Sequence, residues 1–342
     1  MKVEVEVIFK ELIKPSSPTP NHLHHYNLSL LDHLTPQLNN SMVYFFAANG
    51  VSNQFINTTL NASNHLKKTL SQALTHYYPL AGRFVDKAFI ECNDEGALYL
   101  EDKVSPVPYE ITKLLPFGMD EIVDTPLGVQ LNVFECGGIA IGACMSHKIA
   151  DAMSYFMFIQ TWAAIARGEA RDYNEINTHF VSSTLVPPRD IPWYDPNKTI
   201  TKPNTCPKIF VFDASVIDGL KAKYAEKMAL QKPPSRVEAL TTFIWTRFIS
   251  STQVAVAASD QRSRFYVVAH TVNLRSRMDL PLPALAFGNY YRAVKAEDLR
   301  RFENTKGEVV PFTFTALCRF PVYDADFGWG KPIWAFPPPW QN

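Results

Sequence analysis

Apolar and charged residues alternate at the start of the chain. Val3, Val5, Val7 and Phe9 occupy every second position, and the charged residues Lys2, Glu4, Glu6 and Lys10 occupy positions of the other set. This period of two predicts a half-buried β-strand. Similar strand patterns follow in the first half, at residues 83–91, 97–101, 129–134 and 139–145. The last of these is an unbroken apolar run flanked by glycine, which predicts a buried strand.

Two longer segments have helical spacing instead. Between Ser63 and Tyr77 apolar residues recur at intervals of three and four, and the pattern stops before Pro79, which disfavours helical geometry in its predecessor. Residues 151–167 are apolar around most of the helix circumference and end at Gly168, which predicts a buried helix. A strand, a short turn and a helix therefore form the centre of the first half.

The chain changes character between Thr184 and Pro207. This segment is rich in proline and polar residues and has no periodicity, which is typical of a crossover between domains. A length of 342 residues is enough for two domains of ordinary size. We therefore predict a first domain over residues 1–183, a crossover over 184–207 and a second domain over 208–342.

Strands and helices also mix in the second half. Strand patterns occur at residues 208–213, 264–274 and 312–320. Ser235 and Glu238 fit a capping box at the start of a helix that continues to Phe248. Neither half shows regular alternation of strand and helix, so the sequence favours an α+β fold with mixed sheets over a doubly wound parallel sheet.

Composition and charge exclude several classes of partner. The 33 basic residues balance the 33 acidic residues, so no net field attracts nucleic acid or anionic lipid. The apolar runs are too short to span a bilayer, and the charged N-terminus does not resemble a signal peptide. The five cysteines form no CxxC pair, which argues against a disulfide framework or a structural zinc site. We expect a soluble, cytoplasmic protein without a membrane partner.

Candidate chemistry concentrates where the buried strand 139–145 ends. His147 follows this strand, and Asp151 lies four residues later at the mouth of the predicted helix. Histidine accepts a proton near neutral pH, so His147 is a candidate general base. A structural interpretation stays open, in which Asp151 only caps the helix and His147 is a hydrogen-bonded turn residue. Cys144 and Ser146 would point away from His147 on an extended strand, so we do not expect a covalent mechanism.

Other polar clusters lack the companions that their chemistry requires. The histidines at positions 22, 24 and 25 have no cysteine or carboxylate at ligand spacing, so we expect a solvated loop and no metal. Asp326-Phe327-Gly328 resembles the metal-binding tripeptide of protein kinases, but the other kinase motifs are missing. Arg275 and Arg277 are either ion-pair partners of a distant carboxylate or two surface arginines.

Two motifs together resemble the plant BAHD acyltransferase family. His147-Lys148-Ile149-Ala150-Asp151 matches its HxxxD signature, and Asp326-Phe327-Gly328-Trp329-Gly330 matches its DFGWG signature. Further matching segments occur along the chain, at residues 78–83, 93–96, 273–275 and 288–290. Ala152, where many members have glycine, resembles the branch that acetylates alkaloids and terpenoids.

This resemblance implies two domains, each similar to chloramphenicol acetyltransferase, with a solvent channel between them. It implies a monomer that uses acyl-CoA, most often acetyl-CoA, as a co-substrate and has no tightly bound cofactor. A small-molecule alcohol would be the acceptor. His147 would remove the proton of the acceptor hydroxyl, which attacks the thioester directly.

The resemblance also implies roles for other residues. Asp151 would pair with Arg275 and hold the His147 loop in shape, while Asp326 and Gly328 would shape a loop remote from the histidine. Contacts with CoA or substrate would come from Ser235, Arg236, Asn289, Thr313 and Thr315. Ser235 is explained equally well as a helix cap.

The sequence departs from the family pattern in its second half. Residues 295–309 stand where relatives have a long helical section, and the segment after Trp334 differs from their terminal strands. We therefore expect an incomplete second domain with exposed apolar surface and unpaired strand edges. The alternative function is a non-catalytic remnant that binds CoA or acceptor without turnover.

Overall fold

The computed structural model divides the chain into two compact units. It describes residues 4–48, 59–86, 88–105, 111–118, 121, 123–169, 178–190, 208–227, 231–256, 264–279, 282–283, 285–295 and 308–337. Unit 1 comprises residues 1–207, 278–290 and 320–342, and unit 2 comprises residues 208–277 and 291–319.

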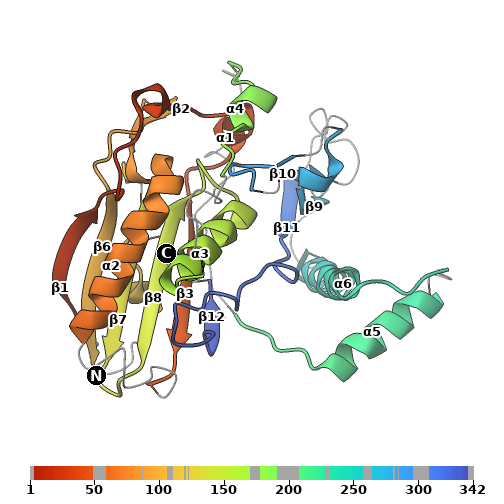
Figure 1. Ribbon diagram of the computed structural model, residues 1–342. Coiled ribbons are helices and arrows are strands. Elements are labelled where there is room, and N and C mark those ends of the chain that lie inside the picture. The colour runs from red at the N-terminus through yellow and green to blue at the C-terminus, as the bar shows by residue number, and fades with distance from the viewer. Residues whose placement is uncertain are drawn as a thin grey trace. The chain divides into compact units, whose positions relative to one another are not determined.

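Unit 1 is built on a six-stranded sheet (Figure 1). Its strands, in spatial order, are β1 (Glu4–Ile13), β6 (Ala97–Ser105), β7 (Leu127–Phe134), β8 (Ile139–Ser146), β3 (Asn39–Phe46) and β12 (Trp334–Phe336). Strands β6 and β7 are parallel, and the other neighbours are antiparallel. A second, antiparallel sheet has the order β2 (His25–Asn27), β5 (Phe89–Glu91) and β4 (Arg83–Val85).

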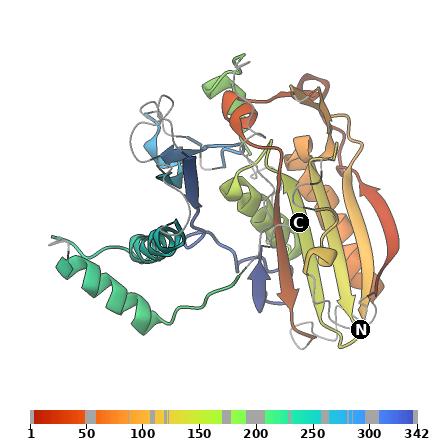
Figure 2. The same cartoon turned by 180° about the vertical axis from the view of Figure 1, so that it is seen from behind.

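Two long helices cover one face of the large sheet. They are α2 (Thr59–His76) and α3 (Ala152–Ala166), and the opposite views in Figures 1 and 2 place both on the same side of the strands. Trp162 of α3 is fully buried and donates a hydrogen bond from Nε1 to Oγ1 of Thr69 on α2, at 3.1 Å. The apolar circumference of α3 is thus buried between the sheet and its neighbours, as its sequence predicts.

Short helices complete unit 1. They are α1 (Leu30–Leu34), α4 (Ser182–Leu185) and three 3₁₀ helices at Asn21–Leu23, Tyr78–Ala81 and Ile111–Leu114. On the other face of the sheet, a buried cluster joins the segment around Leu114 and Phe117 to Val43 of β3 and Cys144 of β8. The sheet is therefore covered by apolar contacts on both faces, which explains why every residue of β8 is buried.

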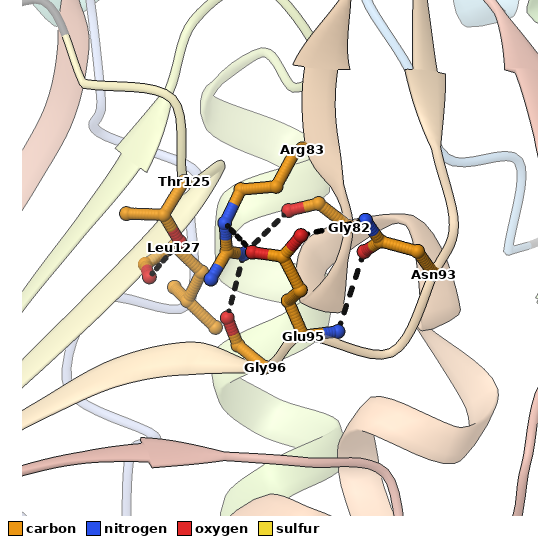
Figure 3. A network of polar contacts seen from close by, with 7 residues as sticks. All are labelled: Gly82, Arg83, Asn93, Glu95, Gly96, Thr125 and Leu127. Carbon is orange, nitrogen blue, oxygen red and sulfur yellow. Dashed lines mark hydrogen bonds and ion pairs between the residues drawn. The ribbon is translucent and has the colours of Figure 1, made fainter.

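Two of the segments that resemble the acyltransferase family meet in unit 1 (Figure 3). Nη1 of Arg83 donates to the carbonyl oxygens of Gly82 and Gly96, at 2.7 and 2.8 Å. Its Nε forms an ion pair with Glu95 at 2.9 Å. Gly82 lies so close to the neighbouring strand that a Cβ would be 2.4 Å from the carbonyl oxygen of Glu91. The network joins the end of one segment to the turn formed by the other.

The described residues of unit 2 form a three-stranded sheet and two α-helices. The strands have the order β10 (Tyr291–Lys295), β9 (Arg264–Asn273) and β11 (Glu308–Phe314), with β9 antiparallel to β10 and parallel to β11. The helices are α5 (Ala214–Lys227) and α6 (Arg236–Val256), and the 3₁₀ helix Arg275–Arg277 follows β9. The ring centroids of Phe248 on α6 and Phe312 on β11 lie 4.6 Å apart. Aromatic contacts of this kind join α6 to the sheet.

The structure confirms most of the predicted elements and changes some boundaries. The predicted strand 83–91 is a pair of strands, β4 and β5, joined by a turn in which Asp86 has a φ of 46°. Residues 208–213 have a strand-like sequence, but in the described part of the chain no strand pairs with them. Ile209, Phe210 and Val211 are consequently 67, 72 and 87% exposed. This exposure agrees with the apolar surface expected of the second domain.

The domain limits differ from the prediction at two places. The boundary before Lys208 is the same, but residues 278–290 and 320–342 belong to unit 1 and not to the second domain. Strand β12 pairs with β3, and the Phe327 ring packs against Trp162 with centroids 4.7 Å apart. Sheet pairing and apolar burial therefore draw the DFGWG segment into the first unit, although it lies far along the chain.

Candidate functional site

The turn between β8 and α3 carries the HxxxD residues. His147 directly follows β8, whose last residue, Ser146, is in register with Asn39 of β3. The backbone N–H of His147 donates to the carbonyl oxygen of Leu38 at 2.7 Å. Ser146 and Lys148 are buried, whereas His147 keeps part of its surface exposed. The histidine is thus held at the end of a buried strand and keeps part of its surface exposed.

Asp151 begins α3 and links it to the segment 288–290. One carboxylate oxygen accepts from the backbone N–H of Ser154 and the other from that of Tyr290, both at 2.9 Å. The side chain is buried. The helix-cap interpretation of Asp151 is therefore confirmed, and its second oxygen adds a long-range bond. The pairing with Arg275, which lies in unit 2, stays a prediction.

Gly288 reinforces the same junction. It has a φ of 143°, and a Cβ there would lie 2.9 Å from Cβ of Ser182. The Ser154 hydroxyl donates to the Gly288 carbonyl at 2.8 Å, and the Gly288 N–H is 3.0 Å from the same hydroxyl oxygen. These contacts fix the segment that carries the next residue, Asn289, beside the histidine turn.

Asn289 joins His147 to a carboxylate of the first helix. Its Nδ2 donates to the His147 backbone carbonyl and to Oδ1 of Asp32, both at 2.7 Å, and its Oδ1 lies 3.2 Å from Nδ1 of His147. Oδ2 of Asp32 accepts from the backbone N–H and the hydroxyl of Ser29, both at 2.7 Å. Asp32 and Asn289 are completely buried. The structure therefore brings Asn289, predicted as a ligand contact, against the imidazole.

Asp32 was missed by reasoning from the sequence. The signal was present, because Ser29-Leu30-Leu31-Asp32 has the spacing of a capping box, and this box forms at the start of α1. A capping box alone, however, predicts a structural role. Only the three-dimensional contact with Asn289 connects this carboxylate to the histidine.

Burial determines the charges of the two titratable groups. Desolvation lowers the pKa of His147 below its ordinary value of 6.5, so the imidazole is neutral at pH 7. Desolvation also raises the pKa of Asp32, to about 6, although the hydrogen bonds from Ser29 and Asn289 oppose this rise. Asp32 is therefore mainly ionised at neutral pH. A neutral, partly accessible imidazole is the form that accepts a proton.

The groups closest to His147 in sequence are not nucleophiles. The Cys144 thiol is buried, accepts a hydrogen bond from Ser41 at 3.1 Å and donates to the Phe117 carbonyl at 3.3 Å. Burial raises the pKa of this thiol to about 12, so it is not a thiolate at neutral pH. The Ser146 hydroxyl accepts from the Lys148 N–H at 3.3 Å. These hydrogen bonds join Cys144 and Ser146 to groups other than the imidazole, which is not the pairing of a nucleophile with its base.

The DFGWG loop lies at the other end of α3. Oδ1 of Asp326 accepts from the backbone N–H groups of Gly328 and Gly330, both at 2.9 Å. Both glycines have positive φ, 105° and 97°, which favours glycine. Arg167, at the C-terminal end of α3, donates to the Asp326 carbonyl. A helix of 15 residues separates this end from Asp151, a distance of roughly 22 Å at the usual helical rise.

The remaining predicted contacts lie in unit 2. Ser235 forms the capping box of α6: its hydroxyl accepts from the Glu238 N–H at 3.3 Å, and its own N–H donates to the Glu238 carboxylate at 2.6 Å. The helix-cap interpretation is thus confirmed. Arg236, Thr313 and Thr315 are exposed. Their contacts with CoA or substrate stay predictions.

The histidine-rich loop makes structural contacts. Nε2 of His24 is 2.9 Å from the Thr19 carbonyl, and the His25 ring stacks on Phe89 with centroids 3.8 Å apart. Among the residues with assigned structure, no three His, Cys, Asp or Glu side chains gather where they would hold a metal ion. Over the same described ranges, no helix has both the length and the apolar character needed to cross a membrane.

Comparison with known proteins places this arrangement in a family. A family model described as the Transferase family matches residues 3–303. The chain belongs to this family. Vinorine synthase from Rauvolfia serpentina and stemmadenine O-acetyltransferase from Catharanthus roseus are each 34% identical to it, over 97% of this chain and 88% of the relative. The resemblance to BAHD acyltransferases, and to their alkaloid acetyltransferases, is therefore confirmed.

Solved structures support the fold of this Transferase family chain. The crystal structure of vinorine synthase matches with a TM-score of 0.73 at 32% identity, covering 98% of this chain and 90% of that one. TRI101 of F. sporotrichioides, in complex with coenzyme A and T-2, matches with a TM-score of 0.68 at 16% identity, over 93% of this chain and 89% of that one. The predicted α+β architecture with two chloramphenicol acetyltransferase-like domains is confirmed.

The alignments also show an internal difference in length. Those with vinorine synthase and stemmadenine O-acetyltransferase extend over 385 and 380 residues, more than the 342 residues of this chain. These relatives therefore carry internal segments without a counterpart here. The shortened connection predicted at residues 295–309 falls mostly outside the described residues, which resume at Glu308.

Proposed function

We propose that this chain transfers an acyl group from acyl-CoA to a hydroxyl group of a small-molecule alcohol. The observation that carries the proposal is the neutral, partly exposed His147, held at the end of a buried strand by backbone and side-chain hydrogen bonds. Membership of a family whose similar relatives are named as O-acetyltransferases supports the same reaction.

In the proposed mechanism His147 acts as a general base. It takes the proton of the acceptor hydroxyl while the oxygen attacks the thioester carbonyl. The tetrahedral intermediate collapses and its carbon–sulfur bond breaks. The imidazolium returns the proton to the departing sulfur, which leaves as the CoA thiol. The ester and free CoA are the products. A covalent acyl-enzyme is not expected, because the protonated Cys144 thiol is buried away from solvent.

We propose acetyl-CoA as the donor and an alkaloid or terpenoid alcohol as the acceptor. Vinorine synthase and stemmadenine O-acetyltransferase support this class. That a protein of this fold, TRI101, forms a complex with coenzyme A supports CoA as a co-substrate. Ser235, Arg236, Thr313 and Thr315 are the proposed CoA contacts in unit 2.

A second candidate is a protein that binds CoA or acceptor without turnover. Two observations favour it: the relatives carry internal segments that this chain lacks, and the strand-like residues 209–211 are exposed. Exposed apolar residues without a strand partner weaken a domain and promote association.

Thiol release distinguishes the two candidates. The purified full chain is incubated with acetyl-CoA and a panel of alkaloid and terpenoid alcohols, and free CoA thiol is titrated. Turnover that His147→Ala abolishes supports the acyltransferase. Saturable binding of CoA in calorimetry, with no release of thiol from acetyl-CoA in the presence of any of the alcohols, supports the binding protein. Turnover that His147→Ala leaves intact contradicts the proposed mechanism.

A further inference from the structure

A chain of buried hydrogen bonds runs from the first helix to the candidate base. Asp32 on α1, Asn289 in the segment after Gly288 and His147 in the β8–α3 turn are far apart in sequence, but all belong to unit 1. Asp32 and Asn289 are completely buried, so no bulk water competes for their hydrogen-bonding groups. The direction of each bond in this chain can therefore be deduced from its donors and acceptors.

The amide of Asn289 has one orientation that satisfies its neighbours. Its Nδ2 faces two groups that only accept hydrogen bonds, the ionised Asp32 carboxylate and the His147 backbone carbonyl, each at 2.7 Å. The reversed amide would place its oxygen against both of these acceptors. Oδ1 of Asn289 must therefore be the atom that faces the imidazole.

An oxygen facing Nδ1 selects one tautomer of a neutral histidine. Oδ1 of Asn289 lies 3.2 Å from Nδ1. An acceptor at this place requires hydrogen on Nδ1, which leaves the lone pair on Nε2. We propose that Asp32 and Asn289 are positioning residues that hold His147 as the Nδ1–H tautomer, so that Nε2 removes the acceptor proton. This proposal rests on the proposed acyl transfer.

Asp32 performs this role because it only accepts hydrogen bonds. Ser29 directs both its backbone N–H and its hydroxyl to Oδ2 of Asp32, so this position must remain an oxygen. Oδ1 of Asp32 is the oxygen that accepts from Nδ2 of Asn289. Nζ of Lys148 donates to the carbonyl oxygens of Asp32 and His33, at 3.2 and 3.3 Å, and ties this helix end to the histidine turn.

The isosteric change Asp32→Asn therefore has a specific expected effect. Ser29 would keep the new amide oxygen, and the new NH₂ group would face Asn289. Asn289 would then lose its preference for one orientation: the original amide opposes the new NH₂ group, and the reversed amide accepts from it but gives up the bond to the His147 carbonyl. In the reversed population the NH₂ group of Asn289 faces Nδ1 of His147, so the imidazole carries its hydrogen on Nε2 and lacks the lone pair that the reaction needs. A change far from the reacting atoms would thus shift the tautomer equilibrium.

The tautomer can be measured directly by NMR. Long-range ¹H–¹⁵N spectra of the labelled full chain distinguish Nδ1–H from Nε2–H in a neutral ring, and His147→Gln identifies the His147 signals by their loss. We expect Nδ1–H in the wild type and an added Nε2–H population in Asp32→Asn. Asn40→Ala is a matched control, because Asn40 donates its amide to the Ala150 carbonyl at 2.7 Å in the same turn. It should keep Nδ1–H.

Turnover gives the second readout. We expect Asp32→Asn to lower kcat for thiol release in proportion to the Nε2–H population, about 10-fold when nine-tenths of the rings carry that hydrogen, with little change in KM because the binding surfaces remain. An Nε2–H wild type overturns the positioning proposal even if no variant folds. An unchanged tautomer in folded Asp32→Asn also overturns it, whether or not the wild type turns over. A tautomer switch in a chain without turnover supports the positioning role and contradicts the acyl transfer.

Discussion

The two aspartates of the family motifs make the same kind of contact at opposite ends of α3. Asp151 accepts the backbone N–H groups of Ser154 and Tyr290, and Asp326 accepts those of Gly328 and Gly330. Asp151 is buried beside His147, whereas Asp326 is partly exposed in a loop at the other helix end. Both carboxylates therefore hold backbone segments in place, but only Asp151 lies beside His147 and belongs to the candidate site.

The largest effect is expected at the histidine itself. His147→Ala removes the base and should lower the rate of thiol release on the order of 10²- to 10⁴-fold, the usual contribution of general base catalysis. The thermal unfolding midpoint should stay close to that of the wild type, because the histidine N–H bond to Leu38 comes from the backbone. Turnover close to that of the wild type would exclude His147 as the base.

Asp151→Ala should have the larger effect of the two aspartates on stability. It removes the cap of α3 and leaves the buried N–H of Tyr290 without its acceptor, a loss of about 2–4 kcal/mol in the free energy of unfolding. Urea denaturation measures this loss. Asp151→Asn is the matched variant, because its remaining oxygen can keep the Ser154 bond, so it should be the milder change. An unchanged unfolding free energy in Asp151→Ala would contradict the buried role of this carboxylate.

Asp326→Ala should be milder in stability and should spare the chemistry. The loop loses two backbone hydrogen bonds at a partly exposed position, which costs about 1–2 kcal/mol. Thiol release per folded molecule should remain near the wild-type value, because Asp326 lies at the far end of α3. Enzyme concentration is corrected by the folded fraction from circular dichroism. A folded Asp326→Ala variant without turnover would show that the DFGWG loop does affect the chemistry at His147.

The smallest effect concerns pH. Burial lowers the pKa of His147, so the neutral base persists as the pH falls through 6.5. Asp32, whose pKa is about 6, takes up a proton before the imidazole does. The rate constant kcat/KM should therefore stay level from pH 8 to about pH 7 and decrease below it, first with Asp32 and then with His147. The measurement is kcat/KM from pH 5 to 8 at constant ionic strength. A decrease that is already complete at about pH 7 would contradict a desolvated His147.

Local sequence patterns predicted the elements that carry the motif residues. The unbroken apolar run before Ser146 predicted β8, which is completely buried, and the apolar circumference after Asp151 predicted α3, which is buried over most of its circumference. Patterns of this kind depend only on burial and helical or strand period. The prediction failed for residues 208–213, since a strand also needs a neighbour with which to pair.

The contacts around the histidine were beyond the reach of local patterns. Asn289 lies 142 residues after His147, and its polar contacts do not follow from any local spacing. Asp32 has the local signature of a helix cap, and its second function depends on the other oxygen, which meets Asn289 only in the fold. For the same reason the sequence assigned the DFGWG segment to the wrong unit. Long-range pairing of β12 with β3 decided its place.

The central claim is that neutral His147 passes the acyl group directly from the thioester to the alcohol. Intact-protein mass spectrometry, combined with thiol titration, tests this claim on the full chain mixed rapidly with acetyl-CoA. Without an alcohol, the account predicts an unchanged protein mass and no burst of thiol. With an accepted alcohol, it predicts one ester for each CoA released. A protein that gains an acetyl group, together with a thiol burst before the alcohol is added, would contradict the account.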